Sequence, residues 1–431
     1  ADRCADGWAA VAEACRPHGT LVVASLDHAG GQGSSAYSQA SLWAPSRVPE
    51  VNTREVPKWM EGDDIAAVID GFGAGAKLAV DAGLDGVEIN AGQHSLVRQF
   101  LSGLTNQRDD EWGQDRLAFA RRVIETVRAA SGERIVGLRL SCDELAPWAG
   151  ITPEMAPDIA TALVGAGLDY LVVTRGSIYT VEKTRPDFHE PTGFNIELCT
   201  SVRAAVQAEH PDVPVILQGS VVDVGQAEWA LGGYDDPARC DAVEMTRAQI
   251  ADPDLVAKLA DGEAARVRPC TRCNQTCQVR DARNPIVTCI GEPTSGRETE
   301  DPDWYVPAAH PRTVAVIGAG PAGLETARVA ATRGHRVVVV ERSASIGGLA
   351  AVAGPNAPLV DWWGRALDPA GVTIDDRSSG DRRTIACTAV VYCGFRLPTD
   401  PITGTIQVGE AVAPRTVHEA VLAGRRAALE A

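Results

Sequence analysis

Residues 313–342 read TVAVIGAGPAGLETARVAATRGHRVVVVER, and they decide the fold of the C-terminal part of the chain. A β-branched run, a glycine-rich turn, an alanine-rich segment and a second β-branched run predict a βαβ unit. Gly318, Gly320 and Gly323 allow a tight turn, close approach of a pyrophosphate and packing of helix on strand. Glu341 ends the second strand, where an acid can take ribose hydroxyls. The stretch predicts binding of an ADP moiety; the alternative is a scaffold that holds no nucleotide.

The chain after this unit is short. TAVVYCG at 388–394 and IQVGEA at 406–411, which contains Gly409 and Glu410, predict two further strands before a final helix. No second glycine fingerprint follows. We therefore expect residues 301–431 to form a reduced Rossmann-like domain for FAD or ADP, without the insertion of a nicotinamide domain.

Four cysteines lie close together just before that domain. Residues 269–289 read PCTRCNQTCQVRDARNPIVTC and contain Cys270, Cys273, Cys277 and Cys289. Three thiols within eight positions and a more distant fourth suit a [4Fe-4S] cluster, which takes four thiolates. A structural zinc ion, more often held by two separated CxxC pairs, and cysteines without metal are the alternatives. We treat residues 266–300 as an iron–sulfur segment.

Residues 1–265 alternate short apolar runs with helical segments. Nearly continuous apolar strands separated by helices predict an α/β fold with a parallel sheet. Polar and glycine-rich residues follow each strand, as on the active-site face of a (β/α)8 barrel. Only six strands are visible although closure needs eight, so we expect N-terminal strands to be missing or supplied by a partner. The predicted strands are 21–28, 84–90, 134–141, 168–174, 213–220 and 240–246.

Composition narrows the classes of function. The chain has 431 residues and a net charge of −17, which disfavours nucleic acid and anionic membranes as partners. No apolar run reaches the ~18 residues of a membrane span. Eleven cysteines in a chain of this size, four of them assigned to a cluster, fit reduced thiols in the cytoplasm better than a secreted disulfide scaffold.

Three segments resemble the iron–sulfur branch of the old yellow enzyme family, which includes 2,4-dienoyl-CoA reductase and trimethylamine dehydrogenase. Residues 87–113 read VEINAGQHSLVRQFLSGLTNQRDDEWG, with QFLS, TNQR and DEWG as in the family's fourth-strand motif. Residues 245–255, MTRAQIADPDL, resemble its last barrel strand, and the cysteine spacing is the branch's own. The segment GQHSLVRQFLSGLTNQ also resembles the corresponding segment of family members that are encoded with the mycofactocin redox system.

The resemblance implies FMN at the strand ends of the barrel. Arg139 would face the flavin pyrimidine, although a strand-end arginine can instead pair with a neighbouring carboxylate. Gly219, Ser220 and Arg247 would hold the flavin phosphate; the alternatives are a turn glycine and a surface ion pair. Glu410 would accept from a ribityl hydroxyl in the place of the family's aspartate.

The substrate positions depart from the family pattern. Asn90 and Gln93 replace the pair that grips the substrate oxygen, Ser25 replaces a flavin-binding glutamine, and Ser95 replaces a tyrosine proton donor. His94 is an alternative proton donor near neutral pH, and a capping or packing role for it is equally open. We expect His28, which also matches a family histidine, to shape its loop.

These features predict an FMN- and [4Fe-4S]-dependent oxidoreductase. A small organic substrate would exchange hydride with the flavin, by reduction of an enoyl or enone group or by oxidation of an N-methyl amine. The cluster would relay single electrons toward the dinucleotide domain, with NAD(P)H or an electron-transfer protein as the electron donor or acceptor, and we expect an oligomer. The alternative is a non-catalytic or electron-transfer subunit partnered with a complete homologue.

Overall fold

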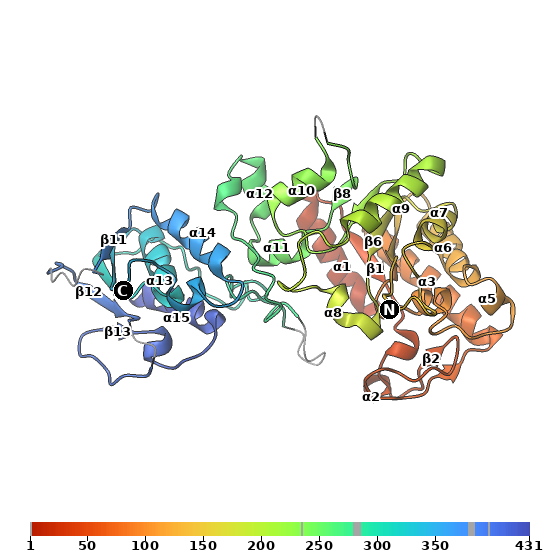
Figure 1. Cartoon of the computed structure of the whole chain (residues 1–431), viewed down its shortest axis with the longest axis horizontal. Helices are drawn as coiled ribbons and strands as arrows, with labels where there is room; N and C mark the ends of the chain where they lie inside the picture. The colour runs from red at the N-terminus through yellow and green to blue at the C-terminus, as the bar shows by residue number, and fades with distance from the viewer. Residues whose placement is uncertain (1, 234–235, 279–285, 378–383, 395–396) are drawn as a thin grey trace. The chain divides into compact units, whose positions relative to one another are not determined.

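A computed structural model describes residues 2–233, 236–278, 286–377, 384–394 and 397–431 (Figure 1). By their contacts the residues divide into two compact units, each described by itself below. Unit 1 comprises Ala1–Val221 and Gly225–Glu244, and unit 2 comprises Val222–Val224 and Met245–Ala431. The cysteine segment and the predicted nucleotide-binding domain both belong to unit 2.

Unit 1 is built on a six-stranded sheet in which every strand is parallel to its neighbours. All six predicted strands are confirmed, and they pair in chain order, as in a barrel wall. Within the described part of the chain the sheet does not close, because its first and last strands each pair on one side only. The strands are β1 Val23–Leu26, β4 Gly86–Ala91, β5 Ile135–Ser141, β6 Tyr170–Thr174, β7 Val215–Leu217 and β8 Ala242–Val243.

Helices of unit 1 contact the strands that precede or follow them (Figure 1). The helix at 118–131 shows why: it buries one apolar stripe, including Phe119, Val123 and Val127, and exposes Arg122 and Glu125 on the other side. The helices are α1 Asp2–Cys15, α2 Ser35–Ser38, α3 Gly62–Asp81, α4 Leu96–Leu101, α5 Glu111–Gln114, α6 Ala118–Ser131, α7 Ala156–Val164, α8 Val181–Thr184, α9 Ile196–Glu209 and α10 Val224–Leu231; a short parallel pair, β2 Trp43–Ala44 and β3 Lys58–Trp59, lies apart from the main sheet.

Unit 2 contains a five-stranded parallel sheet in the order β11-β10-β9-β12-β13. The predicted βαβ unit is confirmed as β9 Thr313–Ile317, α13 Pro321–Thr332 and β10 Arg336–Glu341. The strand predicted at 406–411 ends early, because Gly409 turns the backbone to a φ of 70°. The remaining elements are α11 Thr246–Ala251, α12 Leu255–Ala260, α14 Ala357–Leu367, β11 Thr373–Asp376, β12 Ala389–Tyr392, β13 Ile406–Gln407 and α15 Val417–Glu430.

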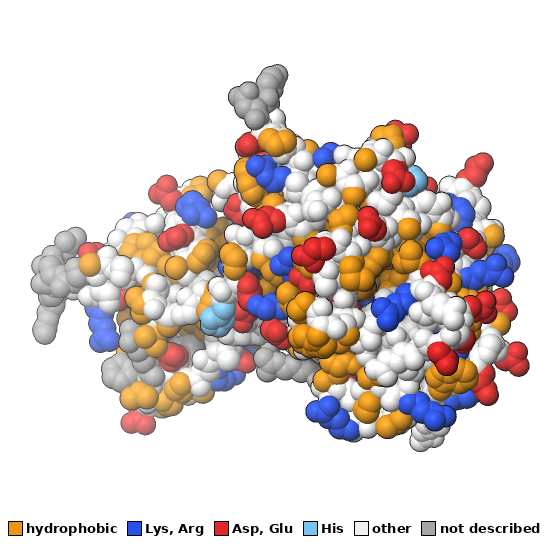
Figure 2. Space-filling model, turned by 45° about the vertical axis from the view of Figure 1, so that its right-hand side comes forward, with side chains coloured by type: hydrophobic (Ala, Val, Ile, Leu, Met, Phe, Trp, Pro, Cys, Tyr) orange, Lys and Arg blue, Asp and Glu red, His pale blue; other side chains and the backbone are white. Residues whose placement is uncertain are grey.

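The core of unit 2 lies around the central strand β9 and the helix α13. Val314 and Val316 are fully buried, and α13 packs closely against α15, where a side chain at Gly424 would collide with the backbone of Ala322. No helix in the described ranges combines the length and apolar character needed to cross a membrane. Acidic and basic side chains are intermixed over the face of the molecule shown in Figure 2.

Candidate functional site

The interior face of the unit 1 sheet holds a charged cluster around Arg139. Arg139 Nε donates to Glu88 Oε1 at 2.8 Å, and its Nη1 donates to Glu244 Oε2 at 2.7 Å. The Tyr170 hydroxyl donates to the other oxygen of Glu88 at 3.0 Å. Gly137 makes room for this ring, because a Cβ there would lie 2.1 Å from the Tyr170 ring. This group of charged side chains therefore depends on a glycine in β5.

Arg139 lies between two carboxylates, Glu88 and Glu244. Pairing with a neighbouring carboxylate was the alternative to a flavin role that its position in the sequence left open. Burial lowers the pKa of the Arg139 guanidinium, but the charges of Glu244 and Glu88 outweigh burial and raise it. Sequence reasoning missed both acids. The signal was present, since each acid has an apolar residue on both sides within a predicted strand, in LDGVEIN and CDAVEMT.

The end of β4 and the loop that follows it contain the predicted substrate-gripping residues. Asn90 Oδ1 accepts from the Gly92 amide at 2.8 Å, and Gln93 Oε1 accepts from the Thr184 hydroxyl at 3.0 Å. Ser95 is fully buried; its hydroxyl donates to the Asn90 carbonyl and accepts from the Val97 amide at 3.0 Å. Ser95 is therefore the N-cap of α4 and is already engaged, which argues against a role as proton donor.

Asp27, directly after β1, is a functional candidate that sequence reasoning missed. Burial raises the pKa of its carboxyl group, partly offset by a hydrogen bond with the Asn90 side chain. Burial lowers the pKa of His94, while the charge of Asp27 raises it. The two groups therefore interact at the carboxyl ends of β1 and β4. His28 Nδ1 accepts from the Gly30 amide at 3.0 Å, in line with the expected loop-shaping role.

We expect Asp27→Asn to lower the pKa of His94 further. A neighbouring carboxylate favours the imidazolium form, so its removal leaves burial to favour the neutral ring. The measurement is a pH titration of the histidine ring signals by NMR, with His94 assigned by His94→Gln. His335, in unit 2, is the internal control whose pKa should stay the same; an unmoved His94 would show that the pair does not interact.

The predicted phosphate loop of unit 1 has an unusual backbone. Gly219 has a φ of 142°, and a Cβ on it would lie 2.7 Å from Asn195 Nδ2. Ser220 follows at a φ of 59°, which is costly for a residue with a side chain and typical of functional loops. Successive amides in such conformations form concavities that bind anions. In unit 2, the Nη1 of Arg247 donates to Asn274 Oδ1 at 2.7 Å, within the cysteine segment.

The cysteine segment lies in one unit, and two hydrogen bonds between Thr276 and Thr288 hold it together. Thr288 N donates to the Thr276 carbonyl at 3.1 Å, and the Thr276 hydroxyl donates back to the Thr288 carbonyl at 3.0 Å. These bonds join the arm that carries Cys277 to the arm that carries Cys289. Arg272 and Asn274, on either side of Cys273, both have left-handed φ values, 54° and 49°. The backbone therefore turns sharply on both sides of Cys273.

The four thiols are free, and they influence one another electrostatically. Burial raises the pKa of Cys270 to about 12, and charge on Cys289 and Cys277 adds to this increase. Burial also raises the pKa of Cys289 to about 11, with Cys273 contributing in the same direction. Among the described residues, no three acidic, histidine or cysteine side chains are arranged to hold a single metal ion. A cubane spreads its ligand sulfurs around a body of eight atoms, a wider arrangement than a single ion requires.

A cavity of about 400 Å³ in unit 2 lies at the predicted nucleotide site. Gly318 has a φ of 102° and Gly323 packs against the Gly318 carbonyl, so both need glycine. A Cβ at Gly320 would meet no atom within 4 Å, which leaves open space at the N-terminus of α13 for an anion. Glu341 accepts from the Ala319 amide at 2.7 Å and keeps further lone pairs. Gly318, Gly320, Glu341, Gly409 and Glu410 all line this cavity.

Both parts of the chain are similar to families of known proteins. The sequence model of the NADH:flavin oxidoreductase / NADH oxidase family matches residues 2–265. The model of an NAD(P)-binding Rossmann-like domain matches residues 316–370. Among solved structures, a complex of 2-naphthoyl-CoA reductase with 2-naphthoyl-CoA is similar with a TM-score of 0.81 and 25% identity, covering 93% of this chain and 63% of that one.

Two curated relatives show the range of named activities. A metal reductase of Desulforamulus reducens is 34% identical over 351 residues, 80% of this chain and 51% of that protein. An N,N-dimethylglycine/sarcosine dehydrogenase of Chromohalobacter salexigens is 34% identical over 405 residues, 89% of this chain and 56% of that protein. The chain thus spans about half the length of the curated relatives it matches.

Proposed function

Because the chain belongs to the NADH:flavin oxidoreductase / NADH oxidase family, we propose that it is a flavin-dependent oxidoreductase with an iron–sulfur cluster. Unit 1 would bind FMN and a small organic substrate. Unit 2 would hold a [4Fe-4S] cluster on Cys270, Cys273, Cys277 and Cys289, and the ADP moiety of a dinucleotide in its glycine-lined cavity. The observation that carries the proposal is the cysteine segment. Hydrogen bonds between Thr276 and Thr288 join its two arms, and burial together with neighbouring cysteines raises the pKa of Cys270, Cys277 and Cys289.

The residues of unit 1 fit a flavin. The strained Gly219–Ser220 turn offers amides suited to a phosphate, and Arg139 supplies a positive charge on the interior face of the sheet. When bound, FMN would accept two electrons, which a cluster can pass on one at a time. Arg139 would remain clamped by Glu88 and Glu244, so this charge is only partly available to a reduced flavin.

We propose an N-methyl amine as the substrate class. Burial lowers the pKa of His94, so the ring is neutral near pH 7 and has a free nitrogen that can accept a proton from a substrate ammonium. Deprotonation exposes the nitrogen lone pair that supports loss of hydride from the adjacent carbon. Ser95, engaged as a helix cap, does not supply the acid that reduction of an enone requires. The relative named for dimethylglycine and sarcosine supports the same class.

The test is an anaerobic spectral titration of the purified chain. We expect a flavin band with a broad iron–sulfur shoulder, and bleaching of the flavin band by N,N-dimethylglycine. Acid extraction should release FMN. Bleaching by NADH with reoxidation by 2-cyclohexenone, and none by the amine, would instead assign the enone reductase activity. A colourless protein without flavin or iron would overturn the proposal.

A second candidate is an electron-transfer subunit partnered with a complete homologue. Two observations favour it: β1 and β8 each pair on one side only in the described residues, and Arg139 is held by two carboxylates. An unclosed parallel sheet presents strand edges that another chain can cover. Cluster absorbance without extractable FMN would support this candidate over the first.

A further inference from the structure

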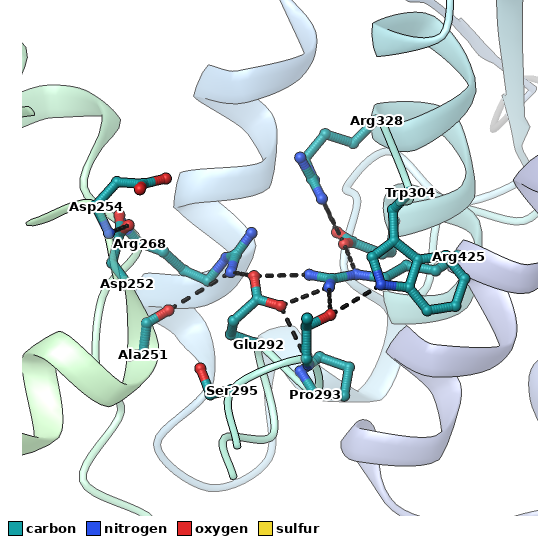
Figure 3. A network of polar contacts seen from close by, with 12 residues as sticks. Ala251, Asp252, Asp254, Arg268, Glu292, Pro293, Ser295, Trp304, Arg328 and Arg425 are labelled. Atoms are coloured by element: carbon teal, nitrogen blue, oxygen red, sulfur yellow. Dashed lines mark hydrogen bonds and ion pairs between the residues drawn. The ribbon is translucent and has the colours of Figure 1, made fainter. Parts of the chain in front are cut away.

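Unit 2 contains a buried charge network of five residues, Arg268, Glu292, Glu325, Arg328 and Arg425 (Figure 3). Arg425 lies at its centre and is fully buried, as is Glu325. Arg425 Nε donates to Glu325 Oε1 at 2.7 Å, and its Nη2 donates to Glu292 Oε2 at 2.8 Å. Arg268 binds the same oxygen of Glu292, and Arg328 Nη2 donates to Glu325 at 2.7 Å.

Further hydrogen bonds fix the network in place. Trp363 Nε1 donates to Glu325 Oε2 at 2.8 Å. Thr294 Oγ1 accepts from Arg425 at 2.7 Å and from Trp304 Nε1 at 2.9 Å. Because the carboxylates are buried and each accepts from two arginines, the charges have little freedom to rearrange.

The network joins the two ends of the cysteine segment. Arg268 precedes Cys270 by two residues, and Glu292 follows Cys289 by three. Their ion pair therefore closes the base of the loop that contains all four thiols. The backbone amide of Arg268 is fixed as well, since it donates to Asp252 Oδ2 at 2.7 Å. The same residues that close the loop thus bring charge next to it.

The network has an excess of positive charge. Three guanidinium groups face two carboxylates, so one positive charge stays uncompensated within it. The nearby Asp252 is neutralised by Lys258 at 2.7 Å. The excess charge lies next to the thiols along the chain, because Arg268 is two residues from Cys270, and Glu292, which pairs with Arg268 and Arg425, is three residues from Cys289. In a buried site such charge is poorly screened.

We propose that this network positions the two arms of the cysteine segment and raises the reduction potential of the cluster that they hold. The inference rests on the cluster assigned under the proposed function. Reduction adds negative charge, so fixed positive charge nearby favours the reduced state; net charge is one of the factors that set cluster potentials. The five residues are positioning residues, since none of them is a ligand.

The experiment measures the midpoint potential of the cluster by EPR-monitored redox titration in two variants that change the charge of the network in opposite directions. Glu292→Gln removes a negative charge and should raise the potential. Arg425→Met removes a positive charge and should lower it. We expect each change to alter the reduction equilibrium by about tenfold, equivalent to about 59 mV for a one-electron couple. Loss of packing alone would not give shifts of opposite sign.

Three further variants sharpen the result. Arg425→Lys keeps the charge and should restore the wild-type potential. Arg328→Met, at the partly exposed end of the network, should lower the potential even where Arg425→Met fails to load its cluster. Asp400→Asn changes an exposed acid that does not line the cavity beside the network, and it should leave the potential unchanged. Shifts that are absent or of the same sign in cluster-loaded variants would overturn this inference alone, whereas wild-type protein without iron and sulfide would overturn it together with the proposed cluster.

Discussion

Cys273→Ala is expected to reduce the iron and labile sulfide content of the purified protein by more than about tenfold. The residue supplies one of four proposed thiolates, and the left-handed residues on either side of it direct the loop around that position. Metal binding and local folding are linked, so losing one ligand should also loosen the loop. The measurements are iron and sulfide assays on anaerobically prepared protein, with proteolysis reporting the order of the loop.

Cys387→Ala is the matched control. Cys387 belongs to the same unit and is also a free, partly buried thiol, but it lies far outside residues 266–300. It should keep wild-type iron content. Equal iron content in Cys273→Ala and the wild type would refute the ligand assignment, and zinc without sulfide in the wild type would identify a structural zinc site instead.

Gly320→Val is expected to weaken ADP binding by at least about tenfold, since a hydrogen bond to a charged group contributes about 1.5–3 kcal/mol. Space around the Gly320 Cβ position is empty, so the added side chain occupies the approach of the pyrophosphate to the first amides of α13. The backbone there has a φ of −77°, which valine adopts without strain. The measurement is isothermal titration calorimetry with ADP on the full chain.

The fold should survive this substitution, which a thermal melt can verify. Gly62→Val is the control, because Gly62 also begins a helix and also has no atom near its Cβ position. It should bind ADP like the wild type. Gly323→Val would not be informative, since its Cβ would lie 1.9 Å from the Gly318 carbonyl oxygen and would damage the fold. Undiminished ADP affinity in Gly320→Val would contradict the assignment of the cavity.

Local pattern was sufficient for most of the secondary structure. Six apolar runs predicted six strands in the correct places, because strands covered on both faces are continuous apolar segments. The strand at 406–411 was predicted too long, since Gly409 can either continue a strand or turn the chain. The strand Thr373–Asp376 went unpredicted because two of its four residues are acidic and most of it is exposed at the sheet edge.

The roles of site residues were harder to predict. Ser95 follows the gripping positions in sequence, yet its hydroxyl is used to begin α4. In the sequence Asp27 is an ordinary acidic residue after a strand. Its burial and its interaction with His94 make it a candidate functional residue. Such properties depend on surroundings that the linear chain does not contain.

The sequence by itself determined the parallel αβ alternation, the glycine turn of the proposed nucleotide site and the spacing of the four cysteines, because each depends on residues that are neighbours along the chain. Only the tertiary structure decided what Arg139 and Arg425 touch. Arg139 meets acids 51 and 105 residues away, and Arg425 meets Glu292 across 133 residues. The physical reason is that charges so distant in sequence interact strongly only after packing has brought them together and removed the water between them.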